Sequence, residues 1–242
     1  DNAAILVDGS GSLVPANWVA FDYRAFGPGG DGGAGGAPIL GGASCGGMGG
    51  AIGDCMGLTQ NAVRYDTPTF AGFSASAAWG ADDFWDVALR YAGEHHGFKV
   101  AAAIAYTEVD DRAFNKILDV DADYFQAGLY IQHIGTGLFG LVNYGHFDDN
   151  TVAFDQDTWY FKAGLRRNWN PLGATVLYGE YQTVDNAYTG TGDFDMWGLG
   201  VVQEIDAAAM SMWIKYRDIE AEFTPGDTFD HQYFQAGALI NF

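Results

Sequence analysis

Few side chains in this 242-residue sequence have the types and spacing that catalysis or metal binding requires. Ser10 has no neighbouring base of the kind that activates a nucleophilic hydroxyl. His95 and His96 are adjacent in an expected tight turn and lack the spaced partners of a metal site. No Gly-x-Ser-x-Gly motif occurs, and the glycine-rich stretch lacks the Gly-Lys-Ser/Thr ending of a phosphate-binding loop. We therefore predict that the protein is not an enzyme.

Paired carboxylates are the other group that could bind a ligand. They occur at Asp110-Asp111 and Asp148-Asp149, in expected loops. Ca²⁺ takes carboxylate and carbonyl oxygens as ligands, so an acidic rim could bind Ca²⁺ that bridges anionic lipid headgroups. The alternative is that these are ordinary solvated loop residues. Apart from Ca²⁺ at these positions, we expect no cofactor.

The composition excludes two broad classes of protein. Eleven Lys and Arg against 31 Asp and Glu give a formal net charge of −20. Phosphate binding needs a basic stripe, so we expect no nucleic-acid partner. An aromatic content of 15% is too high for a disordered chain. The 35 glycines against 6 prolines indicate turns, bends and long loops.

In the segments that would position these side chains, apolar and polar residues alternate with a period of two. In residues 157–166, an apolar face alternates with a face that carries Lys162 and Arg166, which is typical of a half-exposed strand. Eleven such runs are expected, at 61–66, 72–79, 84–92, 97–107, 123–134, 137–147, 157–168, 173–183, 194–204, 208–218 and 231–242. No segment reaches the roughly 18 apolar residues of a membrane helix.

Strand length and connections favour a membrane barrel over a soluble sandwich. Many runs reach the roughly 9–11 residues that a tilted strand needs to cross a bilayer, whereas soluble strands usually have about five or six. The connections alternate between short ones and long acidic ones at about 108–122, 148–156, 184–193 and 219–230. Barrels with tight periplasmic turns and long extracellular loops show this asymmetry. We therefore expect an antiparallel transmembrane β-barrel over residues 61–242.

If the apolar face of each strand is directed to lipid, all the basic strand residues named below fall on the opposite, inward face. This is expected, because a Lys or Arg side chain that faces lipid at the bilayer midplane destabilises a barrel by about 2–4 kcal/mol. The inward basic residues are Arg64, Arg90, Lys99, Lys162, Arg166, Lys215 and Arg217, and the inward acids are Asp66, Asp86 and Glu180. The inward face also carries many Gly, Ala and Gln and few bulky apolar residues. This favours a water-filled lumen, and the alternative is a salt-bridge lattice in a solid barrel. Residues 137–147 are apolar on both faces, so their orientation stays open.

Aromatic residues gather near the expected strand ends, as interfacial girdles require. Trp159, Trp169 and Phe242 are the expected membrane anchors.

Residues 1–60 differ from the rest and contain a glycine-rich stretch at 27–57. An ordered loop of this length is usually functional, and we predict that it folds into the lumen and narrows it. Cys45 and Cys55 should form a disulfide in an oxidising compartment; the alternative is two buried free thiols. The acids of this segment, which would oppose the basic wall, are Asp8, Asp22, Asp31 and Asp54.

Several strings in the chain resemble the strands and turns of general-diffusion porins of the alphaproteobacterial type. They cover residues 61–73, 79–91, 178–181 and 198–210, together with the ending 237–242. The resemblance spans nearly the whole chain. It implies a sixteen-stranded outer-membrane barrel, usually a homotrimer, with a third extracellular loop folded into the pore. By position, residues 1–60 correspond to that loop.

Eleven strands depart from this pattern, because bacterial single-chain barrels have even strand numbers. Strands six to sixteen of such a porin would follow the third loop, so we expect a C-terminal fragment that lacks five strands. The alternative is a complete twelve-stranded barrel in which residues 13–26 supply the first strand.

The predicted function is a passive pore for small hydrophilic solutes and ions. The pore would select by size and by a transverse field between the basic wall and the acidic inner loop. The expected partners are outer-membrane lipid and lipopolysaccharide, the expected assembly is a homotrimer, and the expected location is the bacterial outer membrane. The alternative function is an adhesin or structural barrel with a filled lumen.

Overall fold

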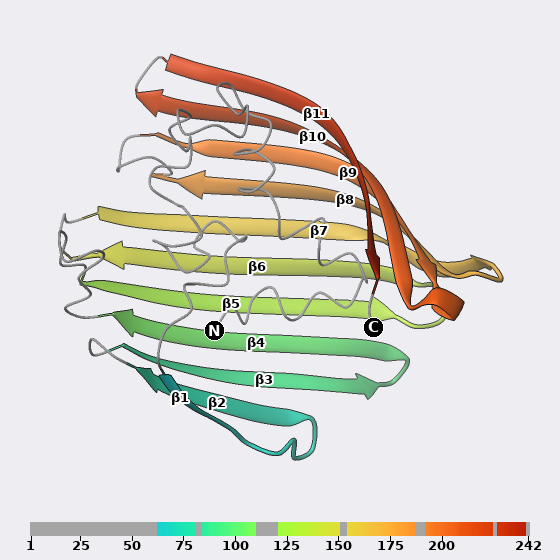
Figure 1. Ribbon diagram of the computed structural model, residues 1–242, viewed down its shortest axis with the longest axis horizontal. Helices are drawn as coiled ribbons and strands as arrows, with labels where there is room; N and C mark the ends of the chain where they lie inside the picture. Colours follow the sequence, from blue (N-terminus) through green and yellow to red (C-terminus); the bar gives the residue numbers. More distant parts are fainter. Residues whose placement is uncertain are drawn as a thin grey trace.

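The computed structural model describes residues 62–80, 84–109, 121–150, 154–186, 192–224 and 227–240. In these ranges eleven strands form one antiparallel sheet, in which each strand pairs with the next along the sequence (Figure 1). The strands are β1 (Ala62–Asp66), β2 (Phe73–Gly80), β3 (Trp85–His95), β4 (Phe98–Val109), β5 (Ala122–His133), β6 (Leu138–Asp149), β7 (Phe154–Asn170), β8 (Gly173–Asp185), β9 (Phe194–Ile205), β10 (Met210–Thr224) and β11 (Asp227–Ile240). The predicted all-β, antiparallel fold is confirmed.

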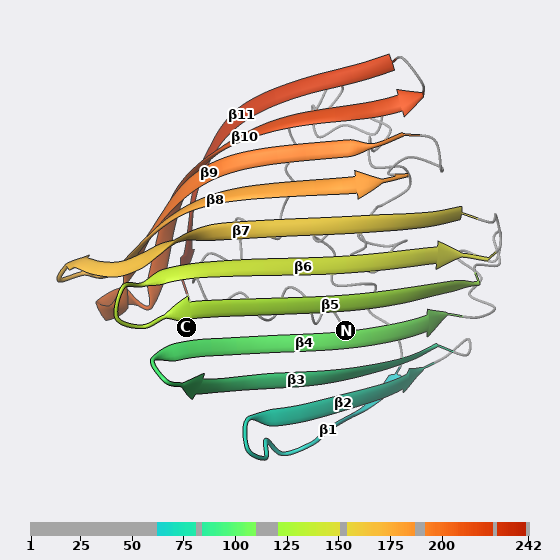
Figure 2. The same ribbon diagram turned by 180° about the vertical axis from the view of Figure 1, so that it is seen from behind.

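The sheet is strongly curved, as Figures 1 and 2 show from opposite sides. Its edge strands, β1 and β11, do not pair with each other within the described ranges. The one helical element described there is η1 (Asp206–Ala208), a 3₁₀ turn between β9 and β10. No helix in the described part of the chain is long and apolar enough to cross a membrane.

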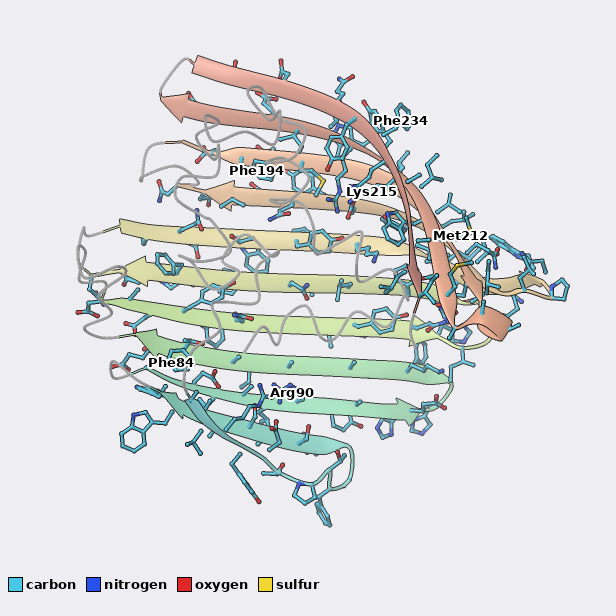
Figure 3. The ribbon with its side chains drawn as sticks, in the orientation of Figure 1. Phe84, Arg90, Phe194, Met212, Lys215 and Phe234 are labelled. Carbon is cyan, nitrogen blue, oxygen red and sulfur yellow. The ribbon has the colours of Figure 1, made fainter. Side chains whose placement is uncertain are left out.

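Side chains alternate between two faces of the sheet, because consecutive strand residues point to opposite sides. We define the inner face as the one that carries Ser76, Gln126, Lys162 and Arg217, all of which are buried. The outer face carries the residues between them in each strand, and these are mostly apolar and exposed. In Figure 3, Arg90, Phe194 and Lys215 belong to the inner face, and Met212 and Phe234 to the outer face.

The strands are joined by tight turns at one end, which we call the short-turn end. These turns are residues 67–72, 96–97, 134–137, 171–172 and 206–209. Gly137 shows why such a turn needs glycine, since its φ is 78° and an added Cβ would lie 2.1 Å from the carbonyl oxygen of Arg166. The backbone N–H of Arg166 donates to the carbonyl of Gly137, which ties the turn to β7.

At the opposite end, which we call the loop end, the strands run further than their hydrophobic pattern indicated. The predicted long connections at 148–156 and 219–230 are partly strand. In the first, β6 continues to Asp149 and β7 begins at Phe154, and in the second, β10 continues to Thr224 and β11 begins at Asp227. Glu220 lies opposite Asp230 in the paired register of β10 and β11. Backbone hydrogen bonds hold a ladder together whatever its side chains are, so polar residues did not end these strands.

The inner face is more apolar than the sequence indicated. In β6, Phe139, Leu141 and Phe147 are buried, which settles the orientation of residues 137–147. A second apolar group lies toward the loop end of β9 and β10, where Phe194, Met196 and Ile219 are buried. The prediction of few bulky inward residues is therefore wrong for these strands. Alternation alone could not orient a segment that is apolar on both faces.

Candidate pore wall

The structure places all seven basic residues of the expected pore wall on the inner face. Those of β1, β3 and β4 are Arg64, Arg90 and Lys99, and those of β7 and β10 are Lys162, Arg166, Lys215 and Arg217. The eighth basic residue in the described ranges, Arg167, lies near the short-turn end of β7 and donates from Nη1 to the carbonyl of Thr136 at 3.1 Å.

One buried charged cluster extends across β7 to β10, and we call it the Glu180 cluster. Arg217 donates from Nε to Oε1 of Glu180 at 2.7 Å and from Nη2 to Oε2 at 3.1 Å. The hydroxyl of Tyr160 donates to Oε2 of Glu180 at 2.6 Å. Lys162 is the register partner of Glu180, and its Nζ lies 4.6 Å from the ring centroid of Tyr178. Lys215, the next inward residue of β10, is also buried.

Glycines in β9 allow this cluster to form. Arg217 is in β10 and Glu180 in β8, so the ion pair crosses the strand between them at Gly198. A Cβ on Gly198 would lie 2.7 Å from Oε1 of Glu180 and 2.9 Å from the carbonyl oxygen of Tyr216. At the next inward position, a Cβ on Gly200 would fall 2.2 Å from the Tyr178 ring. The sequence therefore leaves a path across β9 for long side chains.

A second ion pair crosses a strand nearer the short-turn end. Arg166 in β7 reaches over β8 to Glu204 in β9, with Nη1 donating to Oε1 and Nη2 donating to Oε2 at 2.6 Å. A bidentate pair of this kind fixes both side chains. The pair ties together strands that are not direct neighbours.

Charges on β1 to β3 form a separate, more exposed group. Arg64 donates to both carboxylate oxygens of Asp66, at 2.8–3.1 Å, and the two side chains are 44% and 57% exposed. Arg90 donates from Nη1 to the Ser76 hydroxyl at 3.1 Å. Asp86 is buried on the same face.

Lys99 lies at the short-turn end, with its Nζ 3.4 Å from Oε1 of Glu94. Glu94 was not among the expected wall residues, because residues 93–96 were assigned to a turn. The structure continues β3 to His95, which brings Glu94 onto the inner face in register with Lys99. The inner face thus holds seven basic and five acidic described side chains, the acids being Asp66, Asp86, Glu94, Glu180 and Glu204.

A model of the family described as Gram-negative porins matches residues 11–238. The chain belongs to the Gram-negative porin family. The resemblance predicted from the sequence is thereby confirmed, as is the location in the bacterial outer membrane. No curated protein matches this porin chain in sequence.

Solved structures of outer-membrane proteins share the fold. OccK10 of Pseudomonas aeruginosa is 11% identical with a TM-score of 0.55, and the match covers 75% of this chain and 60% of that one. OmpT of Vibrio cholerae is 15% identical with a TM-score of 0.50, covering 73% and 63%. OccD3 of Pseudomonas aeruginosa is 9% identical with a TM-score of 0.53, covering 75% and 56%. The match to this porin chain therefore spans less than two thirds of each of these structures, and at such identities it shows the fold alone.

Several expected sites of the porin lie outside the described residues. They are the inner-loop segment 1–60 with Asp8, Asp22, Asp31, Asp54, Cys45 and Cys55, the carboxylates Asp110 and Asp111, the anchor Phe242, and residues 13–26 of the twelve-stranded alternative. In the ranges that are described, no three His, Cys, Asp or Glu side chains lie together as a metal site. Calcium at Asp148 and Asp149 stays a prediction.

Two of the three expected anchors lie in the described ranges, and their contact with the membrane stays a prediction. Trp159 is on the outer face of β7 and Trp169 is near its short-turn end, and both side chains are exposed. The ring of Trp159 packs against Tyr144 in β6, with 4.6 Å between centroids.

Proposed function

We propose that this porin chain lines a water-filled pore through which small hydrophilic solutes and ions diffuse passively. The observation that carries the proposal is the sorting of charge across a single sheet. Seven of the eight described basic side chains are on the inner face, and the exposed large apolar side chains of the strands, except Leu239 in β11, are on the outer face. Charge on one face and apolar surface on the other is the pattern of a barrel with a polar interior. The family and fold suggest a channel rather than an enzyme.

We further propose that the pore selects by size and by a field across its lumen. The inner face has two more basic than acidic described side chains, which supports a positive wall. The acids of residues 1–60 would form the opposing side of the field. Arg64 and Arg90 are the wall residues that we propose act on passing ions, because Arg64 is substantially exposed and Arg90 is half-buried, whereas Lys162, Lys215 and Arg217 are buried.

Single-channel recording in planar bilayers tests the pore. The protein purified in detergent from its membranes should give stepwise, ohmic openings that scale with salt concentration. Replacing Arg64 and Arg90 by Gln should shift the reversal potential toward cation selectivity. An unchanged reversal potential in a conducting variant would remove these residues from the proposed field.

The alternative of an adhesin or structural barrel with a filled lumen is favoured by one observation. Phe139, Leu141, Phe194 and Met196 are buried on the inner face, where water would otherwise contact them. A folded, inserted sample that stays electrically silent would support this function and contradict the pore.

The homotrimer, the Cys45–Cys55 disulfide and calcium binding are also proposals. Cross-linking in native membranes tests the trimer, because three linked copies are expected. Mass spectrometry without reduction tests the disulfide. Calcium titration of the Asp148→Asn variant against the unaltered protein tests the proposed metal site.

A further inference from the structure

Aromatic rings on the inner face lie over glycines of the neighbouring strand. Tyr178 in β8 and Gly200 in β9 are directly opposite in register, and a Cβ added to this glycine would overlap Cζ of the tyrosine ring. Trp213 in β10 and Gly237 in β11 are related in the same way. At both glycines the three atoms nearest to the added Cβ all belong to the aromatic side chain. The ring therefore occupies the space that a side chain at the glycine would need.

Two further rings follow the same pattern. A Cβ on Gly164 in β7 would lie 2.8 Å from Cζ of Phe139, its register partner in β6. A Cβ on Gly145 in β6 would lie 2.8 Å from the hydroxyl oxygen of Tyr124 in β5. In all four pairs the glycine belongs to the strand that follows the strand of the ring in the sequence. The four rings therefore lean in the same direction around the inner face.

Glycines on the outer face of the same sheet include two that no ring covers. No atom lies within 4 Å of a Cβ added to Gly140, and the atom nearest to a Cβ on Gly179 is a methyl carbon of Leu199 at 3.4 Å, which is ordinary contact. A glycine weakens a strand, and within a strand it often marks a close approach of another group. At the four inner-face glycines that group is an aromatic ring.

The low exposure of the rings supports a position along the sheet. Phe139 and Tyr178 are 6% and 4% exposed, whereas a ring that stood away from the wall would present both of its faces to the lumen. The Tyr178 ring lies against Gly200, and the Nζ of Lys162 is 4.6 Å from its centroid. Phe139 packs against Tyr130, with 5.7 Å between ring centroids. These contacts account for the burial of both rings.

We propose that these four glycines set the free width of the lumen along β5 to β11. Each glycine lets a ring lie against the sheet instead of standing in the path of a solute. A side chain in its place would push the ring from the wall, and with the sheet behind it the ring can move only toward the lumen. Pore diameter is one of the properties by which a channel selects. The inference rests on the proposed pore and assigns part of its size selection to named wall residues.

Gly200→Ala tests this role with the least disturbance of the backbone. The three atoms nearest to its methyl group belong to Tyr178, so the ring must turn about its χ1 bond to another staggered position. Gly164→Ala is less suitable, because its methyl would also overlap the carbonyl oxygen of Leu177. In planar bilayers, Gly200→Ala should give a lower single-channel conductance than the unaltered protein. Vesicles that contain it should lose permeability to large neutral sugars more than to small ones.

Two control variants separate the ring from other effects of the substitution. Gly140→Ala adds the same methyl group on the outer face, where no atom is close, and should leave the conductance unchanged. In a Tyr178→Ala background there is no ring to displace, so adding Gly200→Ala should not lower the conductance further. A conducting Gly200→Ala variant with unchanged conductance and sugar permeability would overturn the inference and leave the pore intact. Electrical silence of the unaltered protein would instead remove the pore and the inference together.

A second measurement applies if Gly200→Ala does not fold. Gly237→Ala should displace the ring of Trp213 in the same way, and acrylamide in water should then quench the fluorescence of Trp213 more strongly. The chain has seven tryptophans, so Trp213→Phe variants, with and without Gly237→Ala, provide the background to subtract. Equal quenching of Trp213 in the two proteins would overturn the inference, because the ring would not have moved toward water.

Discussion

The inner face carries two charged groups that differ in exposure. In the Glu180 cluster, the side chains of Arg217 and Glu180 are both 0% exposed, whereas those of Arg64 and Asp66 in β1 remain about half exposed. A buried ion pair leaves a large penalty when one partner is removed, and an exposed pair contributes little to stability. The difference teaches that loss of a partner should cost stability in the buried group, whereas the exposed group is the one that we propose acts on ions in solution.

The largest expected effect is in the buried group. Arg217→Met leaves the Glu180 carboxylate without its bidentate partner, and we expect a loss of about 3–5 kcal/mol in the free energy of unfolding. Denaturant unfolding in lipid vesicles measures it. The double variant with Glu180→Gln should recover part of the loss, because the stranded charge is then removed. A double variant as unstable as Arg217→Met would show that the pair is not the cause.

The space above Gly198, through which Arg217 reaches Glu180 across β9, can be filled without replacing a charged residue. Gly198→Ala places a Cβ against Glu180 and the Tyr216 backbone, and we expect a loss of about 1–3 kcal/mol from overpacking. Gly140→Ala is the matched control, since no atom lies within 4 Å of a Cβ there. The same unfolding measurement on both compares them. Equal stability of the two variants would contradict the role assigned to Gly198.

The exposed group should respond in the opposite way. Arg64→Gln is expected to leave the unfolding midpoint nearly unchanged and to shift the reversal potential toward cations, because its charge is close to solvent. Planar-bilayer recordings with a salt gradient measure the shift. If Arg64→Gln unfolds the protein as readily as Arg217→Met does, the distinction between the two groups fails.

The smallest effect is expected at the short-turn end. Lys99 and Glu94 form an ion pair with both side chains more than half exposed. We expect Lys99→Gln to leave stability nearly unchanged, since an exposed pair contributes little. Because Lys99 lies at the short-turn end, we also expect it to shift the reversal potential less than Arg64→Gln does. A selectivity change larger than that of Arg64→Gln would move the proposed selective region toward the turns.

The sequence predicted much of the wall because strand alternation assigns faces. The seven basic residues share a face since lipid excludes their charges, and this constraint is visible in the order of residues alone. Strand alternation could not assign the inner and outer faces of residues 137–147, where both faces are apolar. Nor could it find Glu94, because a predicted turn ended β3 too early.

By itself, the sequence determined the strand order, the inner and outer faces of most strands, and the family. Only the tertiary structure decided which charges meet. Arg217 reaches Glu180 across β9, and Arg166 reaches Glu204 across β8. Such contacts depend on register between strands and on glycines such as Gly198 that leave room, and neither appears in the alternation of a single strand.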